Sequence, residues 1–302
     1  MKKFFDKFKN SLIRFLKGII IGIAMIIPGV SGGTLAVLLN IYDELIDSIN
    51  NLFKDFKKSI SILLPILIGA GVGFIALIVP ISYGLEKCPL IIISLFSGLI
   101  IGGIPQLYKK VQGHEKPRSI IFALLSISLL IGLCFVVTNI VVDFSTIKLG
   151  LLLYLLLGGF LASCALVVPG ISGSMIMMIL GLYSPILIML EEILSFQNLG
   201  HNLLIVLPLA AGLVFGFLSI AKLMGFLLKK HTIDTYFSII GFVVGSIFMI
   251  YYVSITSPDY SFDFSLPSIL FSCLCLIGGF LLTFLLEKKI SQPKEENQNE
   301  TR

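Results

Sequence analysis

The most constraining feature of the 302-residue sequence is a series of long segments that contain no charged residue and no histidine. Each of the eight segments has 20 residues or more, and together they cover 18–42, 59–85, 88–108, 119–142, 149–190, 202–221, 235–257 and 264–286. A helix needs about 20 apolar residues to cross the hydrocarbon core of a bilayer. Charged residues make up 13% of the chain, about half the share in soluble domains. The sequence therefore predicts an all-α polytopic membrane protein.

The same pattern excludes several classes of protein. No polar segment is long enough to fold by itself, which rules out a secreted disulfide scaffold, a nucleic-acid-binding domain and a single-span receptor with a folded ectodomain. The five cysteines lie in apolar segments or at their edges, and we expect them to be small core residues. No ligand pattern predicts a metal or another cofactor. The net charge of +5 is first a topology signal in such a chain.

The two ends of the chain differ from the apolar segments. Residues 1–17 place apolar and basic side chains at near-helical spacing, which predicts an amphipathic helix on the cytoplasmic surface of the membrane. We expect this segment to be retained, because Pro28-Gly29 is a poor signal-peptide cleavage site. Residues 287–302 mix Lys, Glu, Asn and Gln without apolar periodicity, which predicts a disordered cytoplasmic tail.

The sequence also repeats itself at long range. PGVSGG at 28–33 returns as PGISGS at 169–174, which is 141 residues later. With two more residues in the second copy, Leu64-Pro65 matches Leu207-Pro208 and Lys87 matches Lys230. We expect the GxxxG spacings within the repeat to be sites of close helix packing, at 69/73, 98/102, 212/216 and 241/245.

The basic residues indicate how the two copies cross the membrane. If each motif segment crossed once, seven of the 22 Lys and Arg residues would fall outside. If each segment enters and returns on one side, only Lys87 and Lys148 fall outside, and 20 lie inside. The positive-inside rule favours the second arrangement.

The predicted layout is an inverted-topology repeat, in which each half has a re-entrant or broken helical hairpin followed by three transmembrane helices. The first repeat, 18–142, has its hairpin tip at 28–34, and the second, 149–286, has its tip at 169–174. The expected spans are roughly 59–82, 90–108, 119–142, 203–222, 233–253 and 265–286. The run at 149–190 is long enough for two full spans, which would give the same topology. The two tips are expected to face each other near the midplane.

Each hairpin tip has chemistry that suits a phosphate group. A proline interrupts the preceding helix, glycines allow a tight turn and close approach of a ligand, and the following hydroxyls can cap a new helix. A helix N-terminus with free amides and added hydroxyls binds anions. The candidate phosphate site consists of Pro28, Gly29, Ser31, Gly32, Gly33, Thr34, Pro169, Gly170, Ser172, Gly173 and Ser174. The alternative is that each motif is only a turn between two packed half-helices.

Four basic residues are candidate clamps for an anionic headgroup. Lys87 and Lys230 match each other in the repeat and are expected on opposite sides of the membrane. Arg14 and Lys17 belong to the basic N-terminal segment, which could guide acidic headgroups to the site. The alternative for all four is that they anchor helix ends at the membrane interface.

A set of motifs in a fixed order resembles a known family. Lys17-Gly18 is followed by PGVSGGT at 28–34, by Tyr42, by PGISGS at 169–174 and by GLYSP at 181–185. This series resembles the bacterial and archaeal polyprenyl-phosphate transporter family, and the resemblance extends over residues 11–286. The two copies diverge where Thr34 matches Met175, so one hydroxyl of the candidate site has no counterpart.

The resemblance implies a function and a location. A transporter of this kind returns undecaprenyl phosphate, the lipid carrier of cell-wall polymer synthesis, from the outer to the cytoplasmic leaflet. The expected partners are the polyprenyl phosphate and the bilayer, and both termini of this multi-pass protein of the cytoplasmic membrane are expected to be cytoplasmic.

Two other functions fit parts of the same pattern. Undecaprenyl-diphosphate phosphatases also resemble inverted repeats with re-entrant hairpins, but their chemistry uses Glu and His near the tips. General acid–base catalysis needs such a group within hydrogen-bonding reach, and here the tips carry neither, while His114, His201 and His231 are expected in loops. Asp43 and Glu44, at the end of the first hairpin, are expected to be solvated. A small-anion transporter using the same helix ends is the remaining alternative, and no enzymatic activity is expected.

Overall fold

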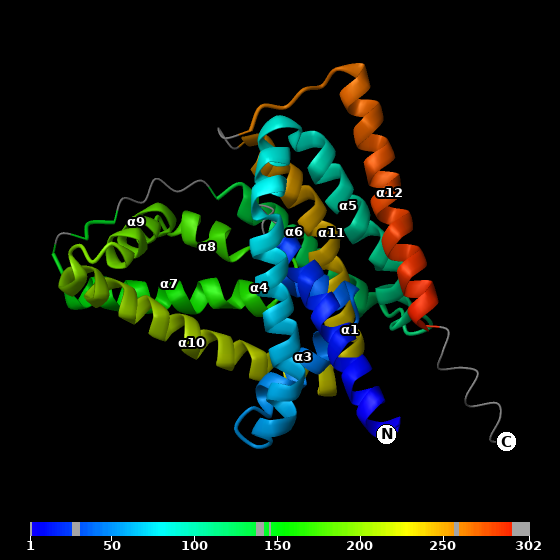
Figure 1. Ribbon diagram of the computed structural model, residues 1–302, viewed down its shortest axis with the longest axis horizontal. Coiled ribbons are helices and arrows are strands. Elements are labelled where there is room, and N and C mark those ends of the chain that lie inside the picture. The colour runs from blue at the N-terminus through cyan, green and yellow to red at the C-terminus, as the bar shows by residue number, and fades with distance from the viewer. Residues whose placement is uncertain (1, 26–30, 137–141, 145, 257–259, 292–302) are drawn as a thin grey trace.

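The computed structural model of the chain describes residues 2–25, 31–136, 142–144, 146–256 and 260–291. These residues form helices joined by turns and loops, and no strand occurs among them (Figure 1). The helices are α1 (Lys2–Ala24), α2 (Gly32–Leu38), α3 (Tyr42–Asn50), α4 (Phe56–Lys87), α5 (Pro89–Lys109), α6 (Pro117–Cys134), α7 (Leu149–Val167), α8 (Gly173–Ile179), α9 (Tyr183–Leu194), α10 (Leu199–Lys230), α11 (Thr232–Thr256) and α12 (Leu266–Ser291).

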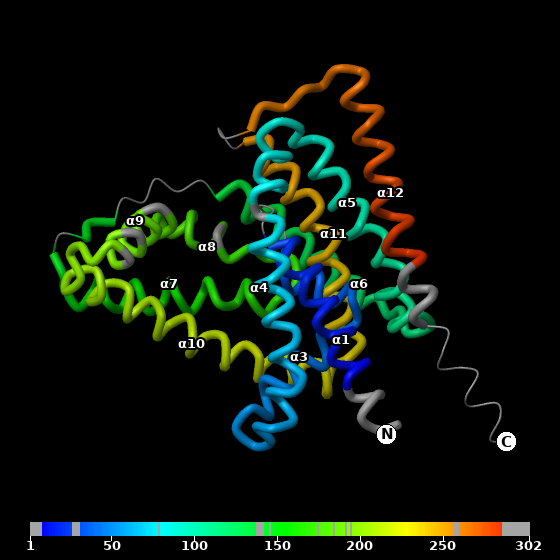
Figure 2. The backbone as a smooth tube through the Cα atoms, viewed as in Figure 1, coloured from blue at the N-terminus to red at the C-terminus, as the bar shows by residue number. Residues whose placement is uncertain are grey.

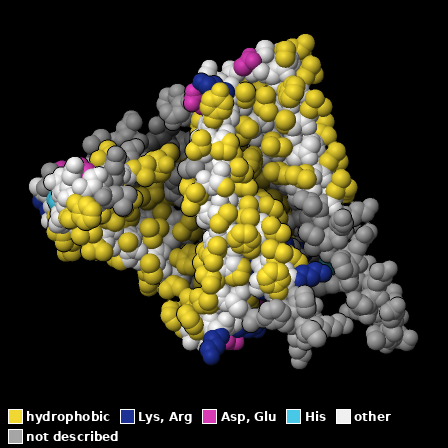
Figure 3. All heavy atoms as spheres, in the orientation of Figure 1, with side chains coloured by type: hydrophobic (Ala, Val, Ile, Leu, Met, Phe, Trp, Pro, Cys, Tyr) yellow, Lys and Arg dark blue, Asp and Glu magenta, His cyan; other side chains and the backbone are white. Residues whose placement is uncertain are grey.

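Seven helices are long and apolar enough to cross a membrane, counted over the residues described above. They are α4, α5, α6, α7, α10, α11 and α12. Large apolar side chains remain exposed along them, for example Ile75 at 75% and Leu274 at 63%, as expected where lipid rather than water is the solvent. Figure 3 shows apolar side chains over most of one face, with charged side chains toward the ends of the molecule. The predicted class, an all-α polytopic membrane protein, is confirmed.

The helix bounds differ from the predicted segments at several places, and α10 continues to Lys230, beyond the predicted end at 222. α1 continues from the basic N-terminal segment into the apolar segment without a break at residue 17. α6 ends at Cys134, short of the predicted end at 142, and residues 137–141 lie outside the described part. α12 extends to Ser291, into the segment predicted to be disordered, and 292–302 lie outside the described residues.

The sequence repeat is also a repeat of local backbone structure. α2 and α8 both have seven residues and begin 141 positions apart, and α4 and α10 both have 32 residues and begin 143 positions apart. The residues before α2 and α8 have nearly the same dihedral angles, with φ −96° and ψ 133° at Ser31 and φ −95° and ψ 128° at Ser172. Positive φ follows both short helices, 53° at Asn40 and 63° at Gly181. Whether the halves are inverted in the membrane stays a prediction.

Glycines hold the long helices together in matched pairs. A Cβ on Gly18 would collide with the carbonyl of Ile66 in the α1–α4 pair, and one on Gly159 would collide with that of Leu209 in the α7–α10 pair. Similar close approaches join α5 to α12 and α6 to α11, so these four helices pair across the two halves. The predicted close packing at the GxxxG spacings is confirmed, since all eight of those glycines face a neighbouring helix.

The helices divide into an upright block and a side arm (Figures 1 and 2). α1, α4, α5, α6, α11 and α12 form the block, which contains most of the largest buried cluster of apolar side chains. α7, α8, α9 and α10 extend from it as the arm, and α7 and α10 are steeply inclined to α4 in this view. The short helices α2 and α3 join the two parts, because α2 contacts α7 and α3 contacts α10.

Candidate functional site

The first Pro-Gly motif ends in a capped helix start. Ser31 has extended backbone angles and precedes α2, and its Oγ accepts a hydrogen bond of 3.2 Å from the amide of Gly33. Ser31 and Thr34 are buried, with 4% and 1% of their surface exposed. The hydroxyl therefore caps the new helix as the motif predicted. Gly32 begins α2, whereas Pro28 and Gly29 lie outside the described residues.

The second motif interrupts the chain between α7 and α8. α7 ends at Val167, and Pro169 has no amide hydrogen with which to continue the helix. Gly170 has φ +88°, and a Cβ there would lie 2.5 Å from the carbonyl oxygen of Phe242 on α11. Only glycine fits this position without strain. Ser172 occupies the cap position before Gly173, but unlike Ser31 its side chain forms no cap hydrogen bond, so the expected cap is not found in the second motif. The side chain of Ser174 lies outside the described part of the structure.

The two motifs are in direct contact through hydroxyl groups of the first half. The Ser31 hydroxyl donates to the carbonyl of Ala165 at 3.3 Å, and the Tyr42 hydroxyl donates to that of Val167 at 2.8 Å. The Thr34 hydroxyl accepts a hydrogen bond of 2.7 Å from the amide of Gly170. We call Ser31, Thr34 and Tyr42 the hydroxyl clasp. All three are buried, so the contact excludes solvent.

The hydroxyl clasp satisfies the polar groups that the break in the second motif leaves without helical partners. In a regular helix the carbonyl of Ala165 would accept from the amide of residue 169, but that residue is proline. The carbonyl of Val167 is at the end of α7, where no further turn follows. A buried group left without a partner costs about 1–3 kcal/mol. The hydroxyls expected to bind a ligand thus also bind the opposite motif.

A second polar cluster fixes α3 to the helices around it. Asp43 accepts hydrogen bonds from the hydroxyl of Tyr236 and from the ammonium group of Lys110, the latter at 3.2 Å. Lys110 also donates to the Tyr236 hydroxyl at 2.7 Å and lies 4.6 Å from the centre of its ring. Asp47 pairs with Lys229 at 2.9 Å. α3 is therefore tied to α5, α10 and α11, although the sequence predicted that Asp43 is merely solvated.

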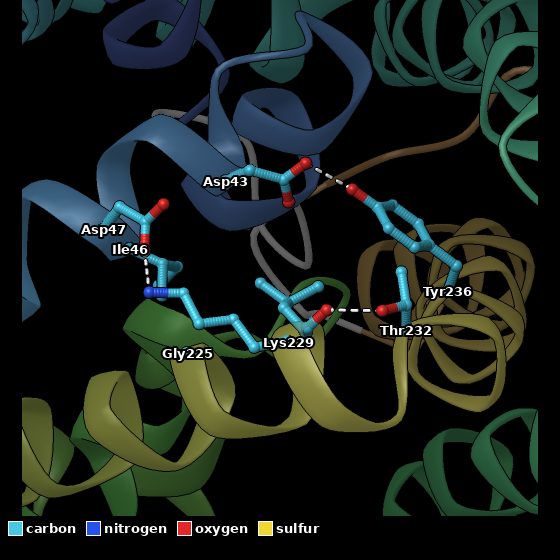
Figure 4. A pocket seen from close by; sticks show the side chains of 8 residues that line it. Asp43, Ile46, Asp47, Gly225, Lys229, Thr232 and Tyr236 are labelled. Carbon is cyan, nitrogen blue, oxygen red and sulfur yellow. Dashed lines mark hydrogen bonds and ion pairs between the residues drawn. The ribbon is translucent and has the colours of Figure 1, made fainter.

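Three of these charged residues, Asp43, Asp47 and Lys229, line a cavity of about 210 Å³ between α3, α10 and α11 (Figure 4). Its lining consists of Asp43, Ile46, Asp47, Gly225, Leu228, Lys229, Thr232 and Tyr236. The sequence alone did not indicate that Tyr236, Lys110 and Lys229 belong to this cluster. The available signal was position: Asp43 directly follows an uncharged segment, and Lys110 and Lys229 lie in segments predicted to share its side of the membrane.

The candidate clamps lie in two kinds of surroundings. Arg14 pairs with Glu44 at 2.6 Å, and Lys17 donates to the carbonyl of Leu39 at 2.7 Å, so both hold the first hairpin. Lys87 pairs with the neighbouring Glu86, and Lys230 lies over the ring of Phe226. Neither Lys87 nor Lys230 forms a hydrogen bond or an ion pair with the motif residues that the structure describes.

The fold and the site together define a class of protein. A helical membrane protein in which two broken-helix motifs from repeated halves meet has a construction found in membrane transporters. The sequence model of a family described as undecaprenyl phosphate translocase-like matches residues 21–261, which include both motifs. The chain belongs to this family.

Two curated relatives agree with this assignment. The polyprenyl-phosphate transporter of Staphylococcus aureus is 33% identical over 244 residues, which cover 79% of this chain and 86% of the relative. The polyprenyl-phosphate transporter of Vibrio cholerae is 30% identical over 255 residues, 80% of this chain and 78% of the relative. No solved structure matches the fold.

Proposed function

We propose that the protein transports a polyprenyl phosphate of the undecaprenyl phosphate class across the cytoplasmic membrane and returns it to the inner leaflet. The contact between the two broken-helix motifs, between Thr34 and the amide of Gly170, is the observation that carries the proposal. It joins the two motifs in a chain whose family is described as undecaprenyl phosphate translocase-like. In this proposal both termini are cytoplasmic.

The phosphate headgroup binds between the motifs and replaces their contacts with each other. Its oxygens accept hydrogen bonds from the amide of Gly170 and from the hydroxyls of Ser31, Thr34 and Ser172, which are the donor types that anions take at broken helices. The complete proposed site also includes Pro28, Gly29, Gly32, Gly33, Pro169, Gly173 and Ser174. The isoprenoid tail remains in lipid beside the apolar outer faces of the helices, so only the headgroup needs shelter.

The basic residues act before and after this step. Arg14 and Lys17 lie on α1, the helix that leads toward the first motif, and attract an anionic headgroup at the cytoplasmic surface. Lys87 and Lys230 end α4 and α10 and serve as headgroup clamps at the two membrane surfaces.

The proposed activity is movement without covalent chemistry. The clasp side chains are two aliphatic hydroxyls and one phenol, and each is hydrogen bonded to backbone groups. Hydrolysis of a phosphate ester would need an acid or a base at the headgroup, and the proposal assigns none. The names of the family and of the two relatives fit transport.

Flipping of a fluorescent polyprenyl phosphate in proteoliposomes tests the function. We expect Ser31→Ala combined with Thr34→Val to slow flipping about tenfold or more, since two headgroup hydrogen bonds of about 0.5–1.5 kcal/mol each are lost. Ser61→Ala is the matched control, because that exposed hydroxyl bonds only within its own helix. Protein that binds inorganic phosphate as tightly as the polyprenyl phosphate, or a double variant that flips lipid at the normal rate, would refute the proposal.

A further inference from the structure

We propose that the hydroxyl clasp is one of two alternative clasps, and that Tyr42 and Tyr183 are the positioning residues that close them in turn. Tyr42 holds the broken end of α7 in the state seen here. In the opposite state Tyr183 holds the broken end of α1. The role of this exchange rests on the proposed transport function, whereas the evidence for it is the geometry of the two halves.

The closed clasp depends on a tyrosine that reaches across the repeat. Tyr42 begins α3 and has 4% of its surface exposed, and its hydroxyl donates to the carbonyl of Val167, 125 residues away. This bond is the one clasp contact made from outside the first motif itself. α3 thereby connects the end of the first hairpin to the break of the second.

The first motif also leaves a backbone carbonyl without its helical hydrogen-bond donor. Proline follows Ala24 by four positions, as Pro169 follows Ala165, so the carbonyl of Ala24 also lacks its regular helical donor. Ala165 accepts from Ser31 in the closed clasp, and the match of Ser31 is Ser172, so in the opposite state Ser172 and Tyr183 together serve the broken end of α1. Ala24 is the last residue of α1 and is fully buried. The repeat places Tyr183 at the position that matches Tyr42, at the start of α9.

Tyr183 is disengaged in the present state. It lies in the side arm, where α9 packs against α8 and α10 (Figure 2), and its hydroxyl forms no hydrogen bond with any described residue. The residues one helical turn after Tyr42 and Tyr183 show the same difference in burial between the two halves. Ile46 on α3 is 3% exposed against α10, whereas the matching Leu187 on α9 is 49% exposed. One half is therefore closed and the matching half is open.

Two further differences favour the state seen here. Thr34 contributes a hydroxyl to the closed clasp, but its counterpart is Met175, which cannot accept a hydrogen bond of comparable strength. Asp43 adds the contacts to Tyr236 and Lys110, but its counterpart is Ser184. The alternative clasp thus lacks counterparts of Thr34 and Asp43 and keeps only those of Ser31 and Tyr42, which are Ser172 and Tyr183, so the two states are unequal in energy.

Cysteine reactivity at matched positions tests the exchange. Ile46→Cys and Leu187→Cys are introduced separately into a protein without its native cysteines, and their reaction with a maleimide is followed in proteoliposomes. We expect Tyr42→Phe to raise the rate at position 46 about two- to tenfold and to lower it at position 187, because one hydrogen bond of the closed state is lost. We expect Tyr183→Phe to change both rates in the opposite directions.

Tyr154→Phe is the matched control. The Tyr154 hydroxyl also donates to a carbonyl, that of Leu180 at 2.7 Å, but this bond lies within the second half. It should lower stability without opposite changes at the two reporters. If Tyr42→Phe and Tyr183→Phe change the reporters in the same direction, or change neither, the inference is wrong even where the lipid is still flipped. Opposite changes in a protein that does not flip the lipid would support the clasps and refute the proposed function.

Discussion

At the scale of single residues, the second motif depends most on Gly170. Its φ of +88° lies in a region that L-residues with a side chain rarely adopt, and the carbonyl of Phe242 occupies the space that a Cβ would need. Its amide also donates to Thr34. The turn geometry, the packing against α11 and the contact between the motifs therefore all depend on one residue without a side chain.

We predict that Gly170→Ala lowers the free energy of unfolding by about 2 kcal/mol or more, since an unfavourable φ alone costs roughly 1–2 kcal/mol. Denaturation of the purified protein in mixed micelles measures the change. Gly150→Ala is the control, because open space surrounds that position in α7. Equal stability of the two variants would show that the backbone at the second motif is not strained by a side chain.

The clasp contacts could not be predicted from the sequence, although the three hydroxyl residues that form them were singled out. Proline, glycine and serine in one short segment are a local signal for a broken helix and a cap. The clasp bonds, in contrast, join residues 134, 136 and 125 positions apart. Which hydroxyl meets which carbonyl depends on how the hairpins pack, and no local pattern encodes that.

At the scale of helices, the close pairs depend on glycines whose Cα atoms touch the neighbouring backbone. In the α5–α12 pair, a Cβ on Gly98 would collide with the carbonyl of Leu276, and one on Gly279 would collide with that of Leu95. Lipid offers no hydrophobic driving force between helices, so this close packing supplies much of their attraction.

Gly98→Ala should therefore destabilise the protein by about 1–3 kcal/mol through overpacking. The control is Gly278→Ala on α12, where open space surrounds the glycine and alanine improves helix propensity by up to roughly 1 kcal/mol. Thermal unfolding in detergent compares the two. A loss of stability in the Gly278 variant as large as in the Gly98 variant would contradict the packing explanation.

The long helices were predictable and the ends of the short ones were less so. Apolar length places α4, α5, α10 and α11 correctly, because nothing but a spanning helix fits such segments. The continuity of α1 was not predicted, because its first part is amphipathic and its second part is uniformly apolar. The composition changes within α1, although the helix itself continues without a break. The polar contacts of Asp43 and Asp47 were missed because their partners lie on α10, on α11 and just after the end of α5.

At the scale of the whole molecule, the two halves share their internal geometry but not their surroundings. The pairs α1–α4 and α7–α10 use equivalent glycine contacts, yet the first pair stands within the block and the second lies in the arm (Figure 1). In the proposed transport cycle, the unequal halves correspond to one of the two alternative states.

The inverted topology predicted from the sequence can be tested by labelling two exposed sites. Phe56, at the start of α4, and Phe196, between α9 and α10, are 62% and 83% exposed. In cells, Phe56→Cys should react with an impermeant maleimide only after the membrane is opened, whereas Phe196→Cys should react at once. Reaction of both sites from the same side would rule out the predicted inversion of the second repeat.

The pairing of α5 with α12 and of α6 with α11 has a consequence for biosynthesis. Each of the two early helices finds its glycine-packed neighbour only in the second half of the chain. While the ribosome is still making α7 to α10, α5 and α6 lack these neighbours, and the glycine face of α5 has no helix to pack against. The last helix to leave the ribosome, α12, completes the packing of α5, so the native assembly forms only after translation has nearly ended.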